Sequence, residues 1–234
     1  MTLAIIQARM GSTRLPGKVM EEVNGLSLVL HTVRRLRKCK LIDVIIIATP
    51  WGKENRPLWD KGAIPIGVDD DDVLSRYKVL ADLVYADTIV RITGDCPLID
   101  PELVDRTIAA LGGHDLATTA FPKRTFAKGA DVEVMSRKGI EKVVRLCKDG
   151  RREHVTLYMY ENPDSFDITS VYDTEDNSSI IICVDYPEDL ERVRDILEWN
   201  EDASYSEVIR YLKEKDESEV SRISDVDGGA SFSN

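Results

Sequence analysis

Residues 3–18 read LAIIQARMGSTRLPGK, and this stretch decides the fold. Its first part, Leu3 to Ala8, is a short apolar run typical of a buried strand. A polar loop, Arg9 to Lys18, follows the run directly and contains glycines and cations. A buried strand that ends in such a loop is typical of an α/β sheet, in which ligands bind beyond the carboxyl ends of the strands.

The same rhythm of apolar runs and helical spacing continues along the chain. We expect further strands over 43–49, 63–68, 88–92 and 180–184. We expect helices over 26–36 and 72–86, helices that begin at Pro101 and at Pro187, and a broken helix over 52–62 that Pro57 interrupts. This alternation predicts a doubly wound, mostly parallel sheet.

The pattern changes after Leu116. Residues 131–135 and 166–172 alternate between apolar and polar side chains, with a helix between them, which indicates a small inserted antiparallel subregion. We therefore predict one domain over 1–215, in which 116–172 is an insertion. Residues 216–234 are rich in Ser, Asp and Gly and are predicted to be a flexible polar tail.

Composition limits the classes of function. The 234 residues carry a formal net charge of −11, so we expect neither nucleic acid nor a membrane surface as a partner. No apolar run is long enough to span a bilayer, and the start of the chain does not resemble a signal peptide. The four cysteines form no CxxC pair, which argues against a zinc site and fits a cytoplasmic protein.

The loop after the first strand is a candidate phosphate site. Its glycines let backbone N–H groups approach an anion, and Arg9, Arg14 and Lys18 can clamp phosphate oxygens. It matches neither the GxxxxGK[ST] nor the GxGxxG pattern. The alternative is an ordinary solvated loop, which three cations in so acidic a chain disfavour.

Six segments together resemble a known family. The opening IIQARMGSTRLPGKV is followed in order by DDVLSRY, RITGDCPLID, GADVEV, REHVTLY and VDYPEDLERV. These segments resemble the spore-coat polysaccharide biosynthesis protein F family, which is similar to the 3-deoxy-manno-octulosonate and, more distantly, the acylneuraminate cytidylyltransferases. The resemblance implies a nucleotide-diphosphosugar-transferase-like fold, a homodimer and Mg²⁺. It also implies transfer of CMP from CTP to a sugar acid or related acceptor, with release of pyrophosphate.

The resemblance also implies site residues. Asp95 and Asp185 match the two carboxylates that hold the metal and, with Arg14 and Lys18, form the predicted catalytic set. Thr93 stands where the octulosonate enzymes have a glutamine near the base, which weakens the inference of cytosine. The predicted nucleotide-binding residues are Ala8, Arg9, Met10, Gly11, Ser12, Arg14, Lys18, Ser75, Arg76 and Thr93. From the sequence alone, Asp95 could instead be a turn residue and Asp185 a helix N-cap.

The acceptor pocket is predicted within the insertion. Asp131 and Glu133 lie two apart on an alternating strand and should point to one face, where they could bind sugar hydroxyls. Arg152 could attract an acidic group of the acceptor, and His154 could contact the acceptor or assist deprotonation. The alternatives are a solvated strand face and a structural histidine.

Two other functions stay open on the sequence. The acidic run Asp69 to Asp72 could serve a glycosyltransferase that uses a nucleotide sugar, although a solvated loop and helix cap explains most of it. A non-catalytic nucleotide-binding subunit is the other possibility.

Overall fold

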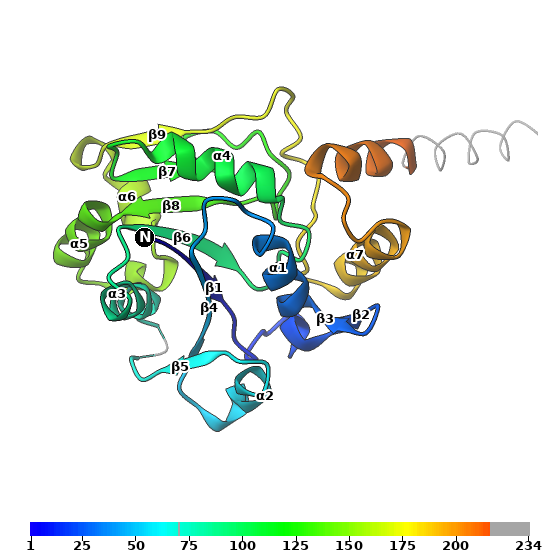
Figure 1. Ribbon diagram of the computed structural model, residues 1–234, viewed down its shortest axis with the longest axis horizontal. Coiled ribbons are helices and arrows are strands. Elements are labelled where there is room, and N and C mark those ends of the chain that lie inside the picture. The colour runs from blue at the N-terminus through cyan, green and yellow to red at the C-terminus, as the bar shows by residue number, and fades with distance from the viewer. Residues whose placement is uncertain (70, 216–234) are drawn as a thin grey trace, which may run out of the picture.

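A seven-stranded sheet forms the centre of the protein, with strand order β5-β4-β1-β6-β8-β7-β9 (Figure 1). The computed structural model describes residues 1–69 and 71–215. The polar tail predicted at 216–234 therefore lies outside the described residues, as does Asp70. A second, two-stranded sheet pairs β2 with β3 in antiparallel fashion.

The elements alternate along the chain as follows. The strands are β1 (Thr2–Gln7), β2 (Glu22–Val23), β3 (Leu26–Ser27), β4 (Val44–Pro50), β5 (Ile64–Ile66), β6 (Thr88–Thr93), β7 (Leu116–Thr118), β8 (Glu133–Ser136) and β9 (Ile168–Ser170). The α-helices are α1 (Leu28–Leu36), α2 (Arg56–Trp59), α3 (Val73–Leu83), α4 (Pro101–Leu111), α5 (Arg137–Leu146), α6 (Leu157–Glu161) and α7 (Pro187–Trp199). Short 3₁₀ turns are η1 (Lys18–Met20), η2 (Lys53–Asn55), η3 (Gly150–His154) and η4 (Pro163–Ser165), and residues 205–215 are helical.

Strand direction confirms the mostly parallel, doubly wound sheet. β1 pairs in parallel with β4 on one side and with β6 on the other, and β4 continues in parallel to β5. Within the described sheet only β8 is reversed, because it is antiparallel to both β6 and β7. The chain runs outward from β1 to β4 and β5, and then returns to the other side of β1 to form β6. The strand order therefore changes direction between β1 and β6. Such a switch point opens a crevice at the carboxyl ends of the two strands, where ligands bind in open α/β sheets.

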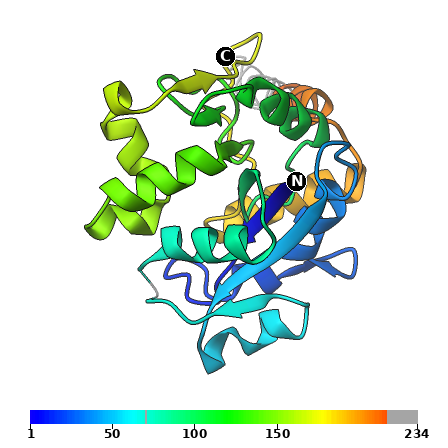
Figure 2. The same ribbon diagram turned by 60° about the vertical axis from the view of Figure 1, so that its left-hand side comes forward.

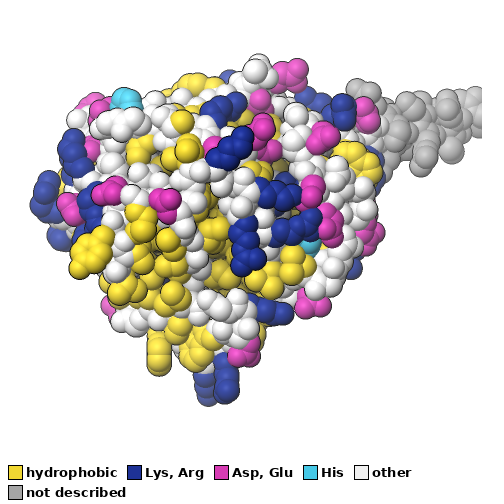
Figure 3. Space-filling model, viewed as in Figure 1, with side chains coloured by type: hydrophobic (Ala, Val, Ile, Leu, Met, Phe, Trp, Pro, Cys, Tyr) yellow, Lys and Arg dark blue, Asp and Glu magenta, His cyan; other side chains and the backbone are white. Residues whose placement is uncertain are grey.

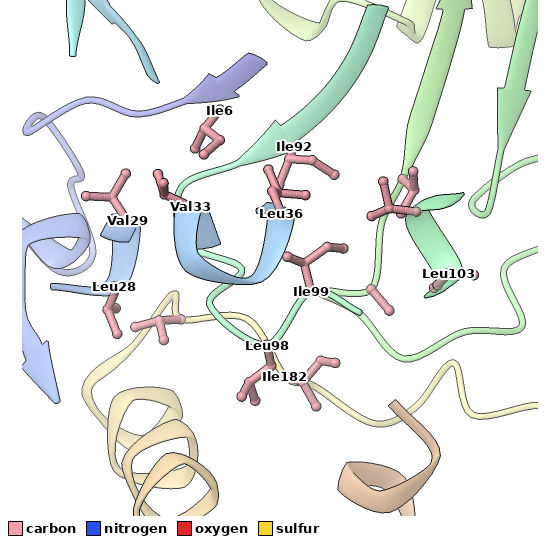
Figure 4. Close-up of a cluster of buried hydrophobic side chains, with 14 of the residues drawn as sticks. Ile6, Leu28, Val29, Val33, Leu36, Ile92, Leu98, Ile99, Leu103 and Ile182 are labelled. Carbon is pink, nitrogen blue, oxygen red and sulfur yellow. The ribbon is translucent and has the colours of Figure 1, made fainter. Parts of the chain in front are cut away.

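Both faces of the sheet are buried, which explains why its central strands read as continuous apolar runs. Along β1, Ala4 and Ile6 belong to one hydrophobic cluster, whereas Leu3 and Ile5 belong to another on the opposite face. In Figure 4, Ile6 and Ile92 from the sheet face Val33 and Leu36 of α1.

The helices divide between the two faces (Figure 2). Helices α1, α4 and α7 contribute to the cluster that contains Ile6, and α3, α5 and α6 contribute to the cluster that contains Ile5. Helix α3 also approaches β1 directly, since the Tyr77 hydroxyl lies 3.5 Å from the carbonyl oxygen of Ile5.

Two expectations about strands need comment. The region 116–172 does contain an antiparallel strand, but its strands β7, β8 and β9 extend the main sheet. The strand predicted over 180–184 is wrong, because this segment makes only an isolated bridge between Lys128 and Ile181. Its apolar residues, such as Ile182 and Val184, are nevertheless fully buried. The apolar run in the sequence therefore predicted burial correctly and strand pairing wrongly.

Lysine and arginine side chains gather on the face that carries α1 (Figure 3). Arg34 of α1 and Lys38, just after the helix, form ion pairs with Asp202, and Arg34 also pairs with Glu201. Acidic neighbours thus neutralise these cations. Among the described helices, none is long and apolar enough to cross a membrane.

Candidate active site

The loops that leave β1 and β6 meet at the switch point and line a cavity of about 230 Å³. The cavity contains the glycine-rich loop, Asp95 and Asp185. A larger hollow of about 910 Å³ lies elsewhere, against α1 and α4, and its lining mixes cations with carboxylates. We place the site in the smaller cavity because only there do a phosphate-type loop and a pair of carboxylates face each other.

The glycine-rich loop closes on itself. The carbonyl oxygen of Met10 accepts hydrogen bonds from the N–H groups of Ser12 and Gly17, both at 3.0 Å. Gly17 adopts a φ of 73°, a left-handed conformation that favours glycine. The buried side chain of Asn55 accepts the N–H of Met10 at 3.0 Å and anchors the loop to η2.

Several N–H groups of this loop remain available for a ligand. Among the described residues, the backbone N–H groups of Gly11, Thr13 and Arg14 donate to no protein acceptor. Successive unused N–H groups next to cations form an anion-binding concavity. This geometry is compatible with the predicted triphosphate loop and offers more than a solvated surface loop needs.

The loop after β6 packs tightly beneath the first one. The Gly94 N–H donates to the Gln7 carbonyl at 2.8 Å, and a Cβ at Gly94 would lie 3.0 Å from that of Ala8. Only glycine fits this approach without a shift. Asp95 follows, and its carbonyl accepts the N–H of Val184 at 2.9 Å. The two segments that carry the carboxylates are therefore joined backbone to backbone.

Asp95 and Asp185 converge on the ammonium of Lys18. The Lys18 Nζ donates to Asp95 Oδ2 at 2.6 Å, to Asp185 Oδ1 at 2.8 Å and to the Val184 carbonyl at 2.7 Å. Burial lowers the pKa of Lys18, but the two carboxylates outweigh burial and hold that pKa above its ordinary value. A lysine ammonium has three hydrogens, so this one has none left for a phosphate.

From the sequence alone, Asp185 could have been the N-cap of a helix. In the structure, the N-cap residue of α7 is Tyr186. The N–H groups of Asp185 and Tyr186 both donate to the carboxylate of Asp189, at 3.0 and 2.9 Å, and this carboxylate caps α7. The Asp185 side chain instead faces cations, with Arg14 at 2.8 Å. Burial raises the pKa of Asp185, but Lys18, Arg14 and Lys128 together hold it below its ordinary value.

The carboxylate pair fits a divalent cation with oxygen ligands. Each carboxylate keeps one oxygen without a close partner among the described residues. Asp95 Oδ1 has only the Cys96 thiol at 3.6 Å, and Asp185 Oδ2 has only the Lys128 Nζ at 3.5 Å. No cluster of three or more His, Cys, Asp or Glu side chains gathers in the described part of the chain. A metal here would complete its shell with substrate phosphates and water.

The predicted residues Ser75, Arg76 and Arg152 lie together at the start of α3. Ser75 bonds to Asp72, which caps the helix, and Arg152 donates to Asp72 at 2.9 Å and to the Ser75 hydroxyl at 2.7 Å. Arg76 is buried. Arg152, predicted to bind the acceptor, therefore lies beside residues that were predicted to bind the nucleotide. Within the acidic run, the Asp72 carboxylate is engaged as a cap and an ion-pair partner.

His154 ends η3 and is exposed. Its neighbour Glu153 lies 3.9 Å from Arg9, so η3 borders the phosphate loop. No hydrogen bond or ion pair is formed by the His154 side chain within the described residues.

Asp131 and Glu133 have different partners, while the alternation that the sequence predicts continues here: Val132 and Val134 belong to one hydrophobic cluster and Met135 to the cluster on the opposite face. Strand β8 begins at Glu133, and Asp131 precedes it in a turn where its carboxylate binds Arg124 and the Gly129 N–H. Glu133 is buried and pairs with Arg91, its register partner on β6. The two carboxylates thus have separate environments.

Both carboxylate oxygens of Glu133 have polar partners. The hydroxyls of Thr156 and Tyr160 both donate to Glu133 Oε1 at 2.5 Å. Burial raises the pKa of Glu133, but Arg91 and the two hydroxyls hold it below its ordinary value. A contact of Glu133 with the acceptor is still untested, and these partners give it a structural role.

Lys128 lies beside the candidate site, and sequence reasoning did not name it. Its N–H donates to the Ile180 carbonyl and its carbonyl accepts the Ile182 N–H, each at 2.8 Å. These bonds fix its backbone beside the segment that leads to Asp185, and its side chain is 49% exposed. An exposed cation next to Asp185 can meet a second anionic substrate. Its place in the GADVEV region was the only signal in the sequence.

Comparisons with known proteins agree with this geometry. The model of the Cytidylyltransferase family matches residues 3–217. The spore coat polysaccharide biosynthesis protein SpsF of Bacillus subtilis is 30% identical over 239 residues, which span 95% of this chain and 98% of that protein. The 3-deoxy-manno-octulosonate cytidylyltransferase of Anaeromyxobacter sp. strain K is 36% identical over 124 residues, half of each chain. The solved structure of a cytidylyltransferase from Leptospira borgpetersenii superposes with a TM-score of 0.86 at 29% identity, covering 92% of this chain and 95% of that one.

The fold and the site together define a nucleotidyltransferase, with a phosphate-type loop opposite two carboxylates at the switch point of an α/β sheet. This chain belongs to the cytidylyltransferase family. It is an enzyme of the class that transfers a cytidylyl group, as the resemblance of its motifs implied.

Proposed function

We propose that this enzyme transfers CMP from CTP to a sugar acid and releases pyrophosphate. The observation that carries the proposal is the unused N–H groups of Thr13 and Arg14, two residues that line the cavity that also contains Asp95 and Asp185. A triphosphate needs such a cradle. The octulosonate cytidylyltransferase relative supports a sugar acid as the acceptor, and the spore coat relative supports a role in polysaccharide biosynthesis.

The residues of this chain position the two substrates and neutralise the charge on the phosphate oxygens. The acceptor hydroxyl attacks the α-phosphorus, the bond from that phosphorus to the bridging oxygen of the β-phosphate breaks, and the hydroxyl proton passes to solvent. Arg9 and the loop N–H groups bind the anionic oxygens, and Arg14 lies at the edge of the same cavity against Asp185 and the ring of Tyr186, 5.2 Å from its centroid. Positioning and charge neutralisation are the main sources of rate in phosphoryl transfer.

Asp95 and Asp185 are proposed to hold Mg²⁺. When bound, the ion supplies charge neutralisation at the reacting phosphate. Lys18 bridges both carboxylates and so holds them side by side, where they would bind the ion. Two carboxylates with substrate phosphates and water form an ordinary Mg²⁺ site.

The acceptor is proposed to bind on the side of residues 124–131. Lys128 beside Asp185 can receive the carboxylate of a sugar acid, and Asp131 can accept hydrogen bonds from sugar hydroxyls. His154 and Arg152 lie on η3, which borders the glycine-rich loop. We therefore expect them to contact the phosphates or the attacking hydroxyl group and not the far end of the acceptor.

We further propose a cytoplasmic homodimer. Strand β9 pairs only with β7 among the described residues, which makes it an edge strand of the sheet. Exposed edges can pair with another chain, and Tyr172 next to β9 is 47% exposed. Cross-linking or light scattering would test the oligomeric state, with a monomer as the contrary result.

The proposed activity is tested by pyrophosphate release. The purified protein is mixed with each of four nucleoside triphosphates, MgCl₂ and a panel of 2-keto sugar acids. We expect acceptor-dependent pyrophosphate release with CTP and loss of the release on chelation. Release of a nucleoside diphosphate from a nucleotide sugar, without pyrophosphate, would instead show a glycosyltransferase.

A further inference from the structure

Gln7 carries a buried polar atom that the chain leaves without a partner. Its side-chain Oε1 is buried and accepts no hydrogen bond from any described residue. Native proteins leave few buried acceptors unsatisfied, because each one loses its hydration without compensation. Gln7 lines the cavity of the active site, so a bound ligand is the natural source of the missing donor.

The strand geometry directs Gln7 to the face of the sheet that α3 covers. Along β1, Ile6 and Ala8 belong to the cluster beneath α1, whereas Leu3 and Ile5 belong to the cluster beneath α3. Side chains alternate along a strand, so Gln7 follows Ile5. Helix α3 packs on this face and carries Ser75 and Arg76 at its start.

Thr93 is the register partner of Gln7 on β6, and it points to the same face. Both residues line the same cavity.

The chemistry of the orphan atom indicates which base it reads. A buried acceptor needs a donor, and the 4-amino group of cytosine is a donor. Uracil has a carbonyl oxygen at the same position, which would face Oε1 as a second acceptor in the amide orientation that the structure has. The glycine-rich loop, Arg9 to Lys18, begins two residues after Gln7, and both line the same cavity.

We propose that Gln7 recognises the 4-amino group of cytosine and is a specificity-determining residue for the donor nucleotide. This inference rests on the proposed function, since it assumes that a cytidine nucleotide binds in this cavity. It goes beyond that function by assigning the choice of base to a side chain of β1.

The test is a comparison of CTP with UTP. Gln7→Leu keeps the shape of the side chain and removes the amide, and Gln7→Met serves the same purpose if Leu impairs folding. We expect the ratio of CTP to UTP affinity, from calorimetric titration, to fall about 10- to 100-fold, the effect of one buried hydrogen bond. The same fall should occur in the ratio of CMP to UMP, because the contact is with the base.

A rescue and a control sharpen the result. Gln7→Leu combined with Thr93→Gln returns a carboxamide from the adjacent strand and should restore part of the preference for CTP. Thr49→Val removes another buried, unpartnered oxygen, Oγ1 on β4, from a residue outside the cavity lining. This control should leave the ratio unchanged, since the group that it removes does not face the nucleotide.

Two contrary results are distinguishable. If the wild-type protein prefers CTP and folded Gln7→Leu keeps that preference, Gln7 does not read the base and the proposed function stands. If the wild-type protein binds CTP no better than UTP, the proposed donor is wrong, and the role of Gln7 falls with it.

Discussion

Replacement of Lys18 by methionine tests whether Asp95 and Asp185 form one cation site. In the structure, the ammonium of Lys18 donates to both carboxylates, and its side chain is only 10% exposed. Lys18→Met keeps most of the apolar stem but leaves two carboxylates facing each other without a cation. Each charge-assisted hydrogen bond is worth about 1.5–3 kcal/mol, and relief from burying the ammonium offsets part of this. We expect the free energy of unfolding to fall by about 2–4 kcal/mol without metal.

Divalent metal should then stabilise the variant more than the wild type. A metal between the carboxylates replaces the lost positive charge in Lys18→Met, whereas in the wild type it must compete with the ammonium. The assay is urea unfolding with and without saturating MgCl₂, since a ligand that binds only the folded state adds to its stability. Lys123→Met is the matched control, because Lys123 is 70% exposed and pairs only with Asp176 among the described residues. It should change stability by less than about 0.5 kcal/mol.

Two outcomes would refute this reasoning. Equal stability of Lys18→Met and the control would mean that the three hydrogen bonds of the Lys18 ammonium do not form in solution. Equal stabilisation of wild type and variant by MgCl₂ would mean that the carboxylates do not share a cation site.

Three further predictions concern activity and pH. Asp95→Asn and Asp185→Asn should each lower kcat by about 100-fold or more in the pyrophosphate-release assay, with the fold retained by circular dichroism, because each removes a charged metal ligand; full activity in either would exclude it from the metal site. Arg14→Ala should weaken binding of CTP more than binding of CMP by calorimetry, because its partners are expected on the β- and γ-phosphates; equal losses would place it elsewhere. Glu133→Gln should cost about 3 kcal/mol at pH 7, because it leaves Arg91 with a neutral partner. The pKa of Glu133 is lowered by folding, so its contribution is present above its ordinary pKa of 4.5 and is lost as pH falls through the folded value. Urea unfolding against pH should therefore show a smaller acid loss in the variant, and identical profiles would contradict the assigned network.

The sequence was informative where local pattern and position coincide. The apolar run before the glycine-rich loop predicted β1 and the switch-point site, because an apolar strand and a loop with special backbone needs are both local features. The strand predicted over 180–184 is wrong because an apolar run indicates burial and does not show whether the segment pairs with another strand. Ile182 is buried as in a strand, but the segment bonds to the backbones of Lys128 and Asp95, which both lie in loops.

The site residues that were missed depend on contacts between distant parts of the chain. Lys128 lies 57 residues from Asp185, and no local pattern connects the two. Gln7 is hidden inside an apolar run, where it looks like an interruption of a buried strand. Its meaning emerges only from its register with Thr93 and from the orphaned oxygen of its amide.

The fate of the α-phosphate tests the central claim most directly. CTP labelled at the α-phosphorus is incubated with the enzyme, MgCl₂ and a 2-keto sugar acid, in parallel with CTP labelled at the γ-phosphorus, and the products are separated. The account predicts that the α-label appears in a conjugate with the sugar acid, while the γ-label appears only in pyrophosphate. Recovery of the α-label in free CMP or CDP alone, with no labelled conjugate for any acceptor, would contradict it.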